Sequence, residues 1–210
     1  MRELYRTNPK TDYHQLVIDW AKMFTGHDIS RGDAKRINFG FAYFMGAPAM
    51  SRKFNWPIEK AQAFQDLYKQ TMPFIVPTRK AVVDVAKGRG YIRTILGRKA
   101  RVSEEMRANK KEYVMFNRLI QGSAADVNKR AMVDAYRAGL FNVLTPHVTV
   151  HDELGVSVPK TKEGVEAFQE LQHVMENAVT LKVPVVADAE IGPSWGETKD
   201  VNWEELYAQV

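Results

Sequence analysis

Apolar positions recur at helical spacing through the first half of the chain. In residues 12–24 the apolar side chains of Leu16, Val17 and Trp20 fall on one helical face, and Asp12 with Gln15 forms a possible capping box at its start. Ser30 is a typical N-cap and Pro57 is typical of a helix start. The pattern therefore predicts four helices, each followed by a stretch containing Gly or Pro: 12–24, ended by Gly26; 30–44, ended by Gly46–Pro48; 58–72; and 77–88.

The period of the pattern changes in the second half. Residues 104–138 have the pattern of one long helix closed by Gly139, and residues 162–180 that of an amphipathic helix. Short stretches that alternate, or that are rich in β-branched residues, predict strands at 91–96, 142–150, 155–158 and 183–191. We therefore expect an α+β fold, with a helical subdomain over residues 1–112 and a second subdomain, a small antiparallel sheet with packing helices, over residues 113–210.

Composition narrows the class of protein. With 210 residues, 45% hydrophobic and 26% charged, the chain is large enough for one core or for two subdomains that share one. The sequence has no Cys, which excludes disulfides, Cys-ligated metal sites and thiol catalysis and suits a reducing compartment. No apolar run approaches the roughly 20 residues that span a bilayer, and no signal-peptide stretch follows the N-terminus. We expect a cytoplasmic protein without a membrane partner.

Charge is unevenly distributed. The net charge is +5, which is compatible with a nucleic-acid partner but does not require one, and the last part of the chain is acidic. Basic residues gather in one segment interrupted by Gly88, Gly90 and Gly97: Lys87, Arg89, Arg93, Arg98, Lys99, Arg101, Arg107, Lys110 and Lys111. A solvated helix face and a loop that contacts phosphates both explain this segment.

Four residues of the second predicted helix recur every fourth position: Arg31, Lys35, Phe39 and Tyr43. At about 100° per residue they form one slowly winding stripe, with two cations toward the helix N-terminus and two aromatics beyond them. The helix dipole and free N–H groups add to the positive end, so a triphosphate fits there and a sugar and base fit the aromatic end. The alternative is an amphipathic helix whose aromatics lie in a core.

The turn at His151-Asp152-Glu153 carries two adjacent acids between apolar strands. If the flanking Val148, Val150, Leu154, Val156 and Val158 are buried, the carboxylates are costly unless paired or bound to metal. Oxygen ligands favour Mg²⁺. The alternative is a surface hairpin with a solvated acidic tip, although such tips usually contain Gly, Asn or Pro.

A third group lies in the long predicted helix. Asn117 and Gln121 are four residues apart, so they share a helix face and can contact a duplex edge. The small residues that follow, from Gly122 to Ala125, allow a close approach of another backbone. Helix–helix packing explains these small residues equally well.

These motifs, in this order, resemble the family A (pol I-like) DNA polymerases. Residues 31–43 (RGDAKRINFGFAY) resemble the O-helix, residues 94–101 the TxxGRRR element and residues 117–126 the Q-helix NxxxQGxAAD. Residues 150–154 resemble motif C, and Gly192–Glu197 resembles the closing GxxWGE. The resemblance covers residues from about 12 to 199. It implies the fingers and the C-terminal palm portion of a phage or bacterial polymerase that performs template-directed nucleotide addition.

The resemblance implies a role for each matching residue. Arg31 and Lys35 would hold the phosphates of an incoming dNTP, with Lys35 also donating a proton to the leaving pyrophosphate; Phe39 would lie by the sugar and discriminate against dideoxynucleotides; and Tyr43 would stack near the template base. Primer–template DNA would be contacted by Thr94, Arg98, Arg101, Asn117, Gln121 and His151. Asp152 and Glu153 would be catalytic metal ligands in a two-Mg²⁺ centre.

The sequence departs from the family pattern in three ways. Phe44 follows Tyr43 where the family usually has Gly, and Tyr113 stands where many relatives have Arg. The family's motif A, a DYSQIELR-type strand with the second catalytic aspartate, has no counterpart, and Asp12-Tyr13-His14 resembles only the DxH that follows it. We therefore expect a split polymerase, inactive as an isolated chain and completed by an N-terminal chain that carries motif A, the thumb and, in some forms, an exonuclease.

Other interpretations of the missing motif remain. The chain is equally explained as a fragment of a longer gene product or as a remnant. A non-catalytic DNA-binding protein that keeps the basic helical part is a second class, and a fragment of a single-subunit RNA polymerase is a third. We expect the protein to act in a bacterial host or a phage-infected cell.

Overall fold

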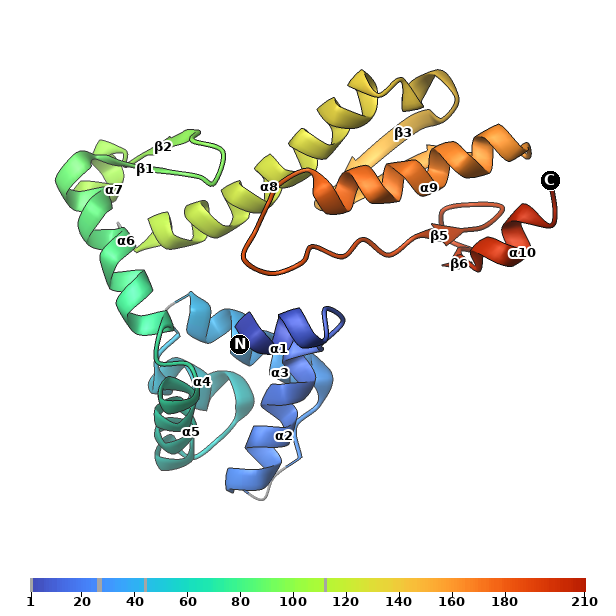
Figure 1. Ribbon diagram of the computed structural model, residues 1–210. Helices are drawn as coiled ribbons and strands as arrows, with labels where there is room; N and C mark the ends of the chain where they lie inside the picture. Colours follow the sequence, from blue (N-terminus) through green and yellow to red (C-terminus); the bar gives the residue numbers. More distant parts are fainter. Residues whose placement is uncertain (1, 26–27, 44, 112) are drawn as a thin grey trace. The chain divides into compact units, whose positions relative to one another are not determined.

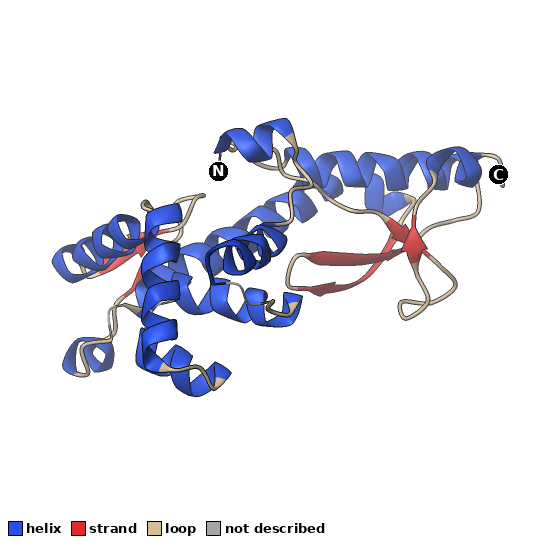
Figure 2. Ribbon diagram, turned by 90° about the horizontal axis from the view of Figure 1, so that it is seen from below, coloured by secondary structure: helices blue, strands red, loops and turns tan. Residues whose placement is uncertain are grey.

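The computed structural model describes residues 2–25, 28–43, 45–111 and 113–210. These residues form many helices and a few short antiparallel strand pairs, so the predicted α+β class is confirmed (Figures 1 and 2). Gly26, the predicted end of the first helix, and Phe44, the departure after Tyr43, lie outside the described residues. Among the described residues, no helix combines the length and apolar character that a membrane crossing requires.

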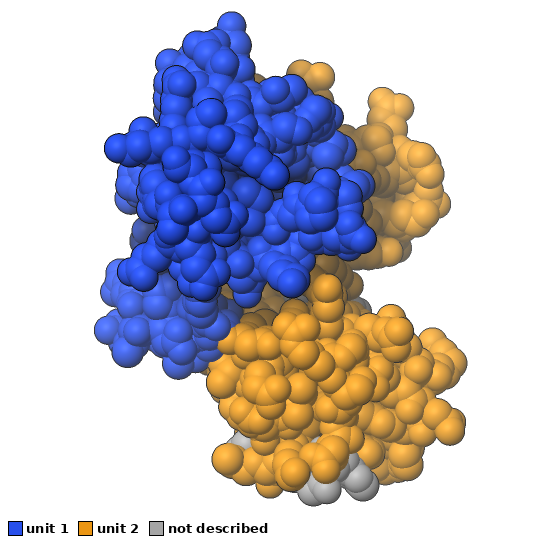
Figure 3. All heavy atoms as spheres, turned by 90° about the vertical axis from the view of Figure 1, so that its right-hand side faces the viewer, with its two compact units in different colours: residues 1–11, 123–210 blue, residues 12–122 orange. Residues whose placement is uncertain are grey.

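The chain divides into two compact units, which Figure 3 colours separately. Unit 1 comprises Met1–Thr11 and Ser123–Val210, and unit 2 comprises Asp12–Gly122. The long helix α8 (Val114–Arg137) contributes residues to both units. The compact units change over at Gly122, whereas the predicted subdomain boundary lies near residue 112, which the structure does not describe.

Unit 2 is mainly helical. Its elements before α8 are α2 (Tyr13–Thr25), α3 (Arg31–Ala42), α4 (Ala47–Phe54), α5 (Ile58–Thr71), α6 (Ile75–Arg89), β1 (Tyr91–Arg93), β2 (Lys99–Arg101) and α7 (Glu104–Ala108). The predicted N-cap Ser30 is confirmed, since its hydroxyl accepts the amide of Asp33 at 3.0 Å. Asp12 caps α2 as predicted, but Gln15 donates to Asp19 instead of reaching back, so the reciprocal capping box is wrong.

One short helix was not predicted, and one predicted helix is broken. The stretch Gly46–Pro48 does more than end a helix: it opens α4, because Pro is tolerated in a first helical turn. The predicted helix 104–138 is broken between α7 and α8, where Lys110 has φ +52. A non-glycine residue in the left-handed region cannot continue an α-helix, and the chain restarts its helix only at Val114.

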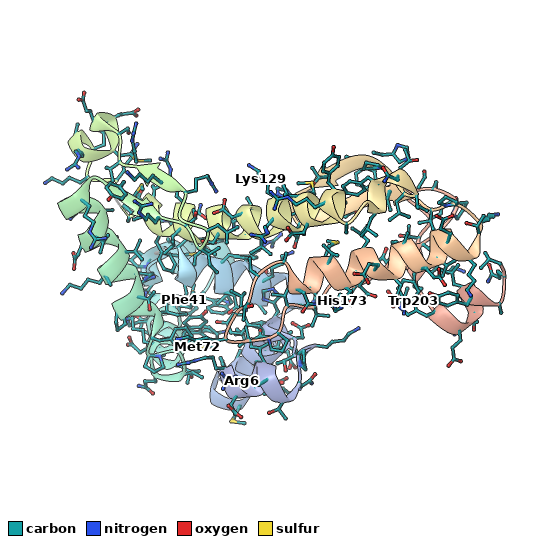
Figure 4. The ribbon with its side chains drawn as sticks, turned by 45° about the horizontal axis from the view of Figure 1, so that its top comes forward. Arg6, Phe41, Met72, Lys129, His173 and Trp203 are labelled. Atoms are coloured by element: carbon teal, nitrogen blue, oxygen red, sulfur yellow. The ribbon has the colours of Figure 1, made fainter. Side chains whose placement is uncertain are left out.

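Two hydrophobic clusters hold unit 2 together. The larger joins α2, α3, α4 and α5 around side chains such as Ile37, Phe64 and Met50, and its buried members include Phe41 and Met72, which Figure 4 labels. The smaller contains Ala86, Ile92 and Met115, so it ties α6 and the β1–β2 pair to the start of α8. The sequence predicted one strand at 91–96, but the chain turns at Gly97 and pairs β1 with β2 instead.

Unit 1 contains the remaining elements: α1 (Arg2–Thr7), the 3₁₀ turn Leu140–Asn142, β3 (Thr145–Val150), β4 (Glu153–Ser157), α9 (Lys162–Asn177), β5 (Glu190–Ile191), β6 (Lys199–Asp200) and α10 (Trp203–Tyr207). The predicted hairpin is confirmed as β3–β4, and its core lies against α8 and α9 through Ala135, Leu144 and Leu171. Trp203 of α10, labelled in Figure 4, packs on Phe168 of α9.

The predicted strand 183–191 is correct only at its end. Glu190 and Ile191 pair with β6, whereas residues 182–189 run with alternating burial and no strand partner among the described residues. They are held instead by side chains: Gln172 of α9 donates to the carbonyl of Ala187, and Arg6 of α1 to that of Lys182. Alternating burial is the mark of a strand, so this segment has strand character without a ladder.

Candidate functional site

The predicted stripe lies on the exposed face of α3. Ala34 and Ile37 are fully buried and Phe41 is nearly so, whereas Arg31 and Lys35 are exposed and Phe39 is 44% exposed. The 3.6-residue period separates these sets onto opposite faces. The alternative that the helix aromatics belong to the core therefore holds for Phe41 and not for Phe39.

The aromatic end of the stripe continues onto α8. The rings of Phe39 and Tyr43 lie parallel, with centroids 6.3 Å apart, and Tyr43 meets the buried Phe116 edge-on at 6.4 Å. Gln121 Nε2 donates to the hydroxyl of Tyr43 at 3.1 Å. Two motifs far apart in the sequence thus meet within unit 2. An open hollow beside them is lined by Gly40, Tyr43, Met45, Ala49 and Tyr113.

The cationic end has a neighbour in α2 that the sequence analysis did not assign. Arg31 Nε lies 3.0 Å from Asp12 Oδ2, and this hydrogen bond lowers the pKa of the Asp12 carboxyl. Desolvation acts in the opposite direction, and the amides that Asp12 caps lower the pKa further. His14 Nδ1 lies 2.8 Å from Asn38 Nδ2, and its ring centroid is 6.0 Å from that of Phe39. His14 comes from another helix, so the period of α3 gives no signal for it.

The basic segment forms a hairpin between two helices. The interpretation as one solvated helix face is therefore wrong for residues 91–101, while contact with phosphates stays a prediction. Its turn contains Gly97 at φ +86, and the buried Thr94 (5% exposed) closes it by donating its hydroxyl to the carbonyl of Arg98. Thr94 thus shapes the turn and offers little surface, whereas Arg98 and Arg101 are exposed.

The same hairpin is fastened to α8. Arg98 Nη2 donates to the carbonyl of Gly122 at 2.8 Å, and Arg118 Nη1 donates to that of Arg101 at 3.1 Å. A Cβ at Gly122 would stand 3.0 Å from a methyl carbon of Thr94 and 3.1 Å from Arg98, so the small residue admits the hairpin. Asn117 and Gln121 are exposed on this part of α8. Unit 2 therefore brings most of the predicted nucleotide- and DNA-contacting residues into one connected set.

The acidic turn lies in unit 1. His151 and Asp152 join β3 to β4, with Val150 paired to Glu153. Asp152 and Glu153 are exposed, as is Val148, and the other flanking apolar residues are only half-buried. We expected the acids to lie within a buried strand pair, and this expectation is wrong for the described residues. Among them, β3 has β4 as its only strand neighbour.

Two contacts organise this turn. The indole Nε1 of Trp195 donates to Glu153 Oε1 at 2.5 Å, which joins the Gly192–Glu197 motif to the turn. The buried Asn128 of α8 donates to the carbonyl of His151 at 2.8 Å. The sequence motif Gly192–Glu197 includes Trp195 but does not reveal its partner, and Asn128 belongs to no motif, since the contacts span 42 and 23 residues along the chain.

The donor chemistry of the turn suits a hard cation in part. Asp152 and Glu153 offer carboxylate oxygens, the ligands that Mg²⁺ prefers, and one Glu153 oxygen is engaged by Trp195. Within the described residues, no group of three or more His, Cys, Asp or Glu side chains gathers closely enough to hold a metal ion. The turn thus fits as part of a ligand set.

A family model described as DNA polymerase family A matches residues 1–197. The chain belongs to DNA polymerase family A. The DNA-directed DNA polymerase of Pseudomonas phage M6 is 34% identical over 97% of this chain and 33% of the relative. DNA polymerase I of Deinococcus radiodurans is 35% identical over 80% of this chain and 18% of the relative, so the chain spans a third or less of these curated relatives.

A solved structure agrees with the family assignment. The polymerase domain of Pol1 from M. smegmatis, in complex with DNA primer–template and dNTP, superimposes with a TM-score of 0.72 at 28% identity. The match covers 87% of this family A chain and 34% of that domain. The expected resemblance is confirmed in both sequence and fold, because the matching family model and the matching solved structure are both those of DNA polymerases.

Proposed function

We propose that this chain provides the fingers (residues 1–112) and the C-terminal part of the palm (residues 113–210) of a DNA-directed DNA polymerase. The observation that carries the proposal is the exposed stripe of α3, two cations followed by two aromatics, linked through Tyr43 to Gln121 of α8. A charged triphosphate and a flat base need surfaces of these two kinds side by side. The bacterial and phage relatives support work in the cytoplasm of a bacterium, infected or not.

Nucleotide binding is assigned to the α3 stripe. Arg31 and Lys35 bind the phosphates. Arg31 gives up its exposed ion pair with Asp12 to bind a phosphate oxygen, and the free-energy cost of this exchange is small because solvent screens the exposed pair. Phe39 lies by the sugar. Tyr43 stacks near the template base, next to the open hollow.

Primer–template contact is assigned to the basic hairpin and to the first turns of α8. Arg98 and Arg101 meet backbone phosphates, and their anchoring to α8 supports a fixed register on the duplex. Asn117 and Gln121 contact the duplex edge, and His151 the primer end. Thr94, which we expected to touch DNA, contributes by holding the turn that presents Arg98.

Catalysis is assigned to Asp152, with Glu153 assisting, and to Lys35. The two carboxylates would hold Mg²⁺ by their oxygens, and the bound ion would supply Lewis acidity for nucleotidyl transfer. Lys35 donates a proton to the departing pyrophosphate, a contribution of about 10²–10⁴-fold for a positioned general acid. The Asp152 side chain is exposed, and this exposure supports its role as a metal ligand that shares the ion with ligands from other residues.

The second aspartate of a two-ion centre comes, in this proposal, from polypeptide outside the 210 residues, either a second chain or another part of a longer one. Two features support an added strand. The segment 182–189 alternates in burial without a ladder, and β3 has exposed side chains along its length. The edge of β3 that faces away from β4 has no strand partner among the described residues, and such an edge favours strand addition.

The proposal is tested by primer extension with Mg²⁺ and dNTPs. We expect no extension by the 210-residue chain alone and template-directed extension once a family A segment carrying motif A is supplied. Asp152→Ala in the completed enzyme should lower kcat by about three orders of magnitude. Glu170→Ala, an exposed carboxylate of the same unit on α9, is the matched control and should keep full activity.

The same assay separates the alternative. A non-catalytic DNA-binding remnant would bind a primer–template equally well as wild type and as Asp152→Ala, and no added segment would produce extension. That result would contradict the polymerase proposal.

A further inference from the structure

Asn128 lies buried beneath the tip of the β3–β4 hairpin. Only 8% of the residue is exposed, and its Nδ2 donates two hydrogen bonds, to the carbonyl of His151 at 2.8 Å and to Thr149 Oγ1 at 3.1 Å. A carbonyl oxygen can only accept, so the amide must present its NH₂ group to the hairpin. One side chain of α8 thus contacts both the end of β3 and the loop that follows it.

The loop needs an external holder because of its backbone. Val150 pairs with Glu153, which leaves a two-residue connection, His151–Asp152, and His151 has φ +56. Glycine or asparagine normally occupies such a position, since a larger side chain is strained there. His151 lacks that freedom, and nothing in its own side chain replaces it.

The bonded carbonyl is the one that joins His151 to Asp152. A peptide unit is planar, so holding this oxygen fixes the plane of the His151–Asp152 peptide. That plane contains the N–Cα bond of Asp152, so rotation about this one bond (φ of Asp152) is what remains to set the direction of its Cα–Cβ bond. The contact therefore acts on the orientation of the carboxylate through the backbone, without touching it.

The oxygen of the Asn128 amide shows that this side chain is not chosen for packing. Its Oδ1 is buried and has no hydrogen-bond partner among the described residues. The next residues on this face of α8, Ala131 and Ala135, are buried and apolar. An apolar residue would fill position 128 without an unsatisfied oxygen, so packing alone gives no reason for an amide there.

We propose that Asn128 is a positioning residue for Asp152. It holds the His151–Asp152 peptide in the orientation that aims the carboxylate, in place of the glycine that such a turn normally uses. The catalytic consequence rests on the proposed function, while the structural consequence concerns the hairpin alone. Thr149 is exposed and forms only one of the two bonds, so it anchors the strand and not the turn.

The test compares Asn128→Leu, which removes the donor and keeps the branched shape of the side chain, with Thr149→Val, which removes one acceptor and keeps the His151 contact. Asn128→Asp is the second test variant, because a carboxylate cannot donate to the His151 carbonyl. Amide hydrogen exchange is measured on the 210-residue chain. We expect about tenfold faster exchange confined to residues 151–153 in both Asn128 variants and little change in Thr149→Val. In Asn128→Leu, α9 and the thermal midpoint stay unchanged, whereas the buried carboxylate of Asn128→Asp lowers the midpoint.

The second readout is steady-state extension by the completed polymerase. We expect both Asn128 variants to lower kcat by about 10²-fold, the cost of a misplaced catalytic group. The KM for dNTP should stay within about twofold, because the nucleotide surface is assigned to other residues.

Three outcomes would overturn the proposal: unchanged exchange at 151–153 in both Asn128 variants, faster exchange throughout unit 1 with a lowered thermal midpoint in Asn128→Leu, or an equal effect of Thr149→Val. If wild type itself shows no extension with any added segment, the proposed function fails. Local exchange at 151–153 then still decides whether Asn128 holds the turn.

Discussion

His14 decides by its charge how many cations meet at the N-terminal half of α3. Partial burial lowers the pKa of its imidazole; nearby Asp12 raises it, and Arg31 and Lys35 lower it again. At neutral pH the imidazole is therefore uncharged beside two permanent cations.

We predict that an NMR titration of the His14 ring gives a pKa below the ordinary value of 6.5, higher in Lys35→Ala and lower in Asp12→Asn. Asn is a good N-cap, so the second variant keeps the start of α2. Because the folded pKa is depressed, the unfolded chain binds more protons as pH falls below about 6.5, and stability is lost from there down through the folded pKa. His14→Gln should remove this slope from thermal unfolding curves; an unchanged slope would contradict the assignment.

Single residues differ in how far sequence alone reveals them. Arg31, Lys35 and Phe39 are predictable because one helical period orders them, and the structure leaves all three exposed. Asn128 and Trp195 act through contacts between distant segments, for which no local pattern exists. The burial of the acidic turn was overestimated. Alternating residues show which face of a strand is apolar, but they do not show whether another element covers that face.

Among elements, the long helices with a clear hydrophobic period were predictable, whereas the short helix and the helix break between them were not. The helices α3, α5 and α9 follow caps and periods that the sequence displays. The short α4 and the break at Lys110 depend on single backbone conformations that a period of 3.6 does not encode. Residues 182–189 can form a hydrogen-bonded ladder only with a partner strand. The sequence of this segment therefore predicts strand character but not membership of a sheet.

The loop between β5 and β6 allows a matched pair of glycine substitutions. A Cβ at Gly192 would stand 2.0 Å from the Glu197 carbonyl oxygen, whereas one at Gly196 meets no atom within 4 Å. We expect Gly192→Ala to lower the free energy of unfolding by about 1–3 kcal/mol, the range for overpacking against backbone. Gly196→Ala should change it by less than about 0.5 kcal/mol. Urea unfolding of both variants checks this, and equal losses would argue against the steric reason.

At the scale of the molecule, each compact unit has hydrophobic clusters of its own. Phe64 lies in the large cluster of unit 2 and Leu171 in that of unit 1, each 2% exposed. Fold class followed from the change of period along the chain. The division of α8 between two units did not, because a continuous helix carries no sequence mark of the contacts made by its halves.

We predict that truncating either core residue loosens its own unit first. Phe64→Ala and Leu171→Ala should each cost about 2–5 kcal/mol. Hydrogen-exchange mass spectrometry should show faster exchange in α4 and α5 for the first variant and in β3, β4 and α9 for the second. Uniformly faster exchange in both would mean that the chain unfolds as a single cooperative body.

The hydrogen bond from Trp195 to Glu153 has a practical side. The indole is 61% exposed and held by one carboxylate of the acidic turn. Indole emission depends on the polarity and hydrogen bonding around the ring. Whatever draws Glu153 away, a cation or an arriving strand, therefore changes the light that Trp195 emits, and the turn carries its own optical label.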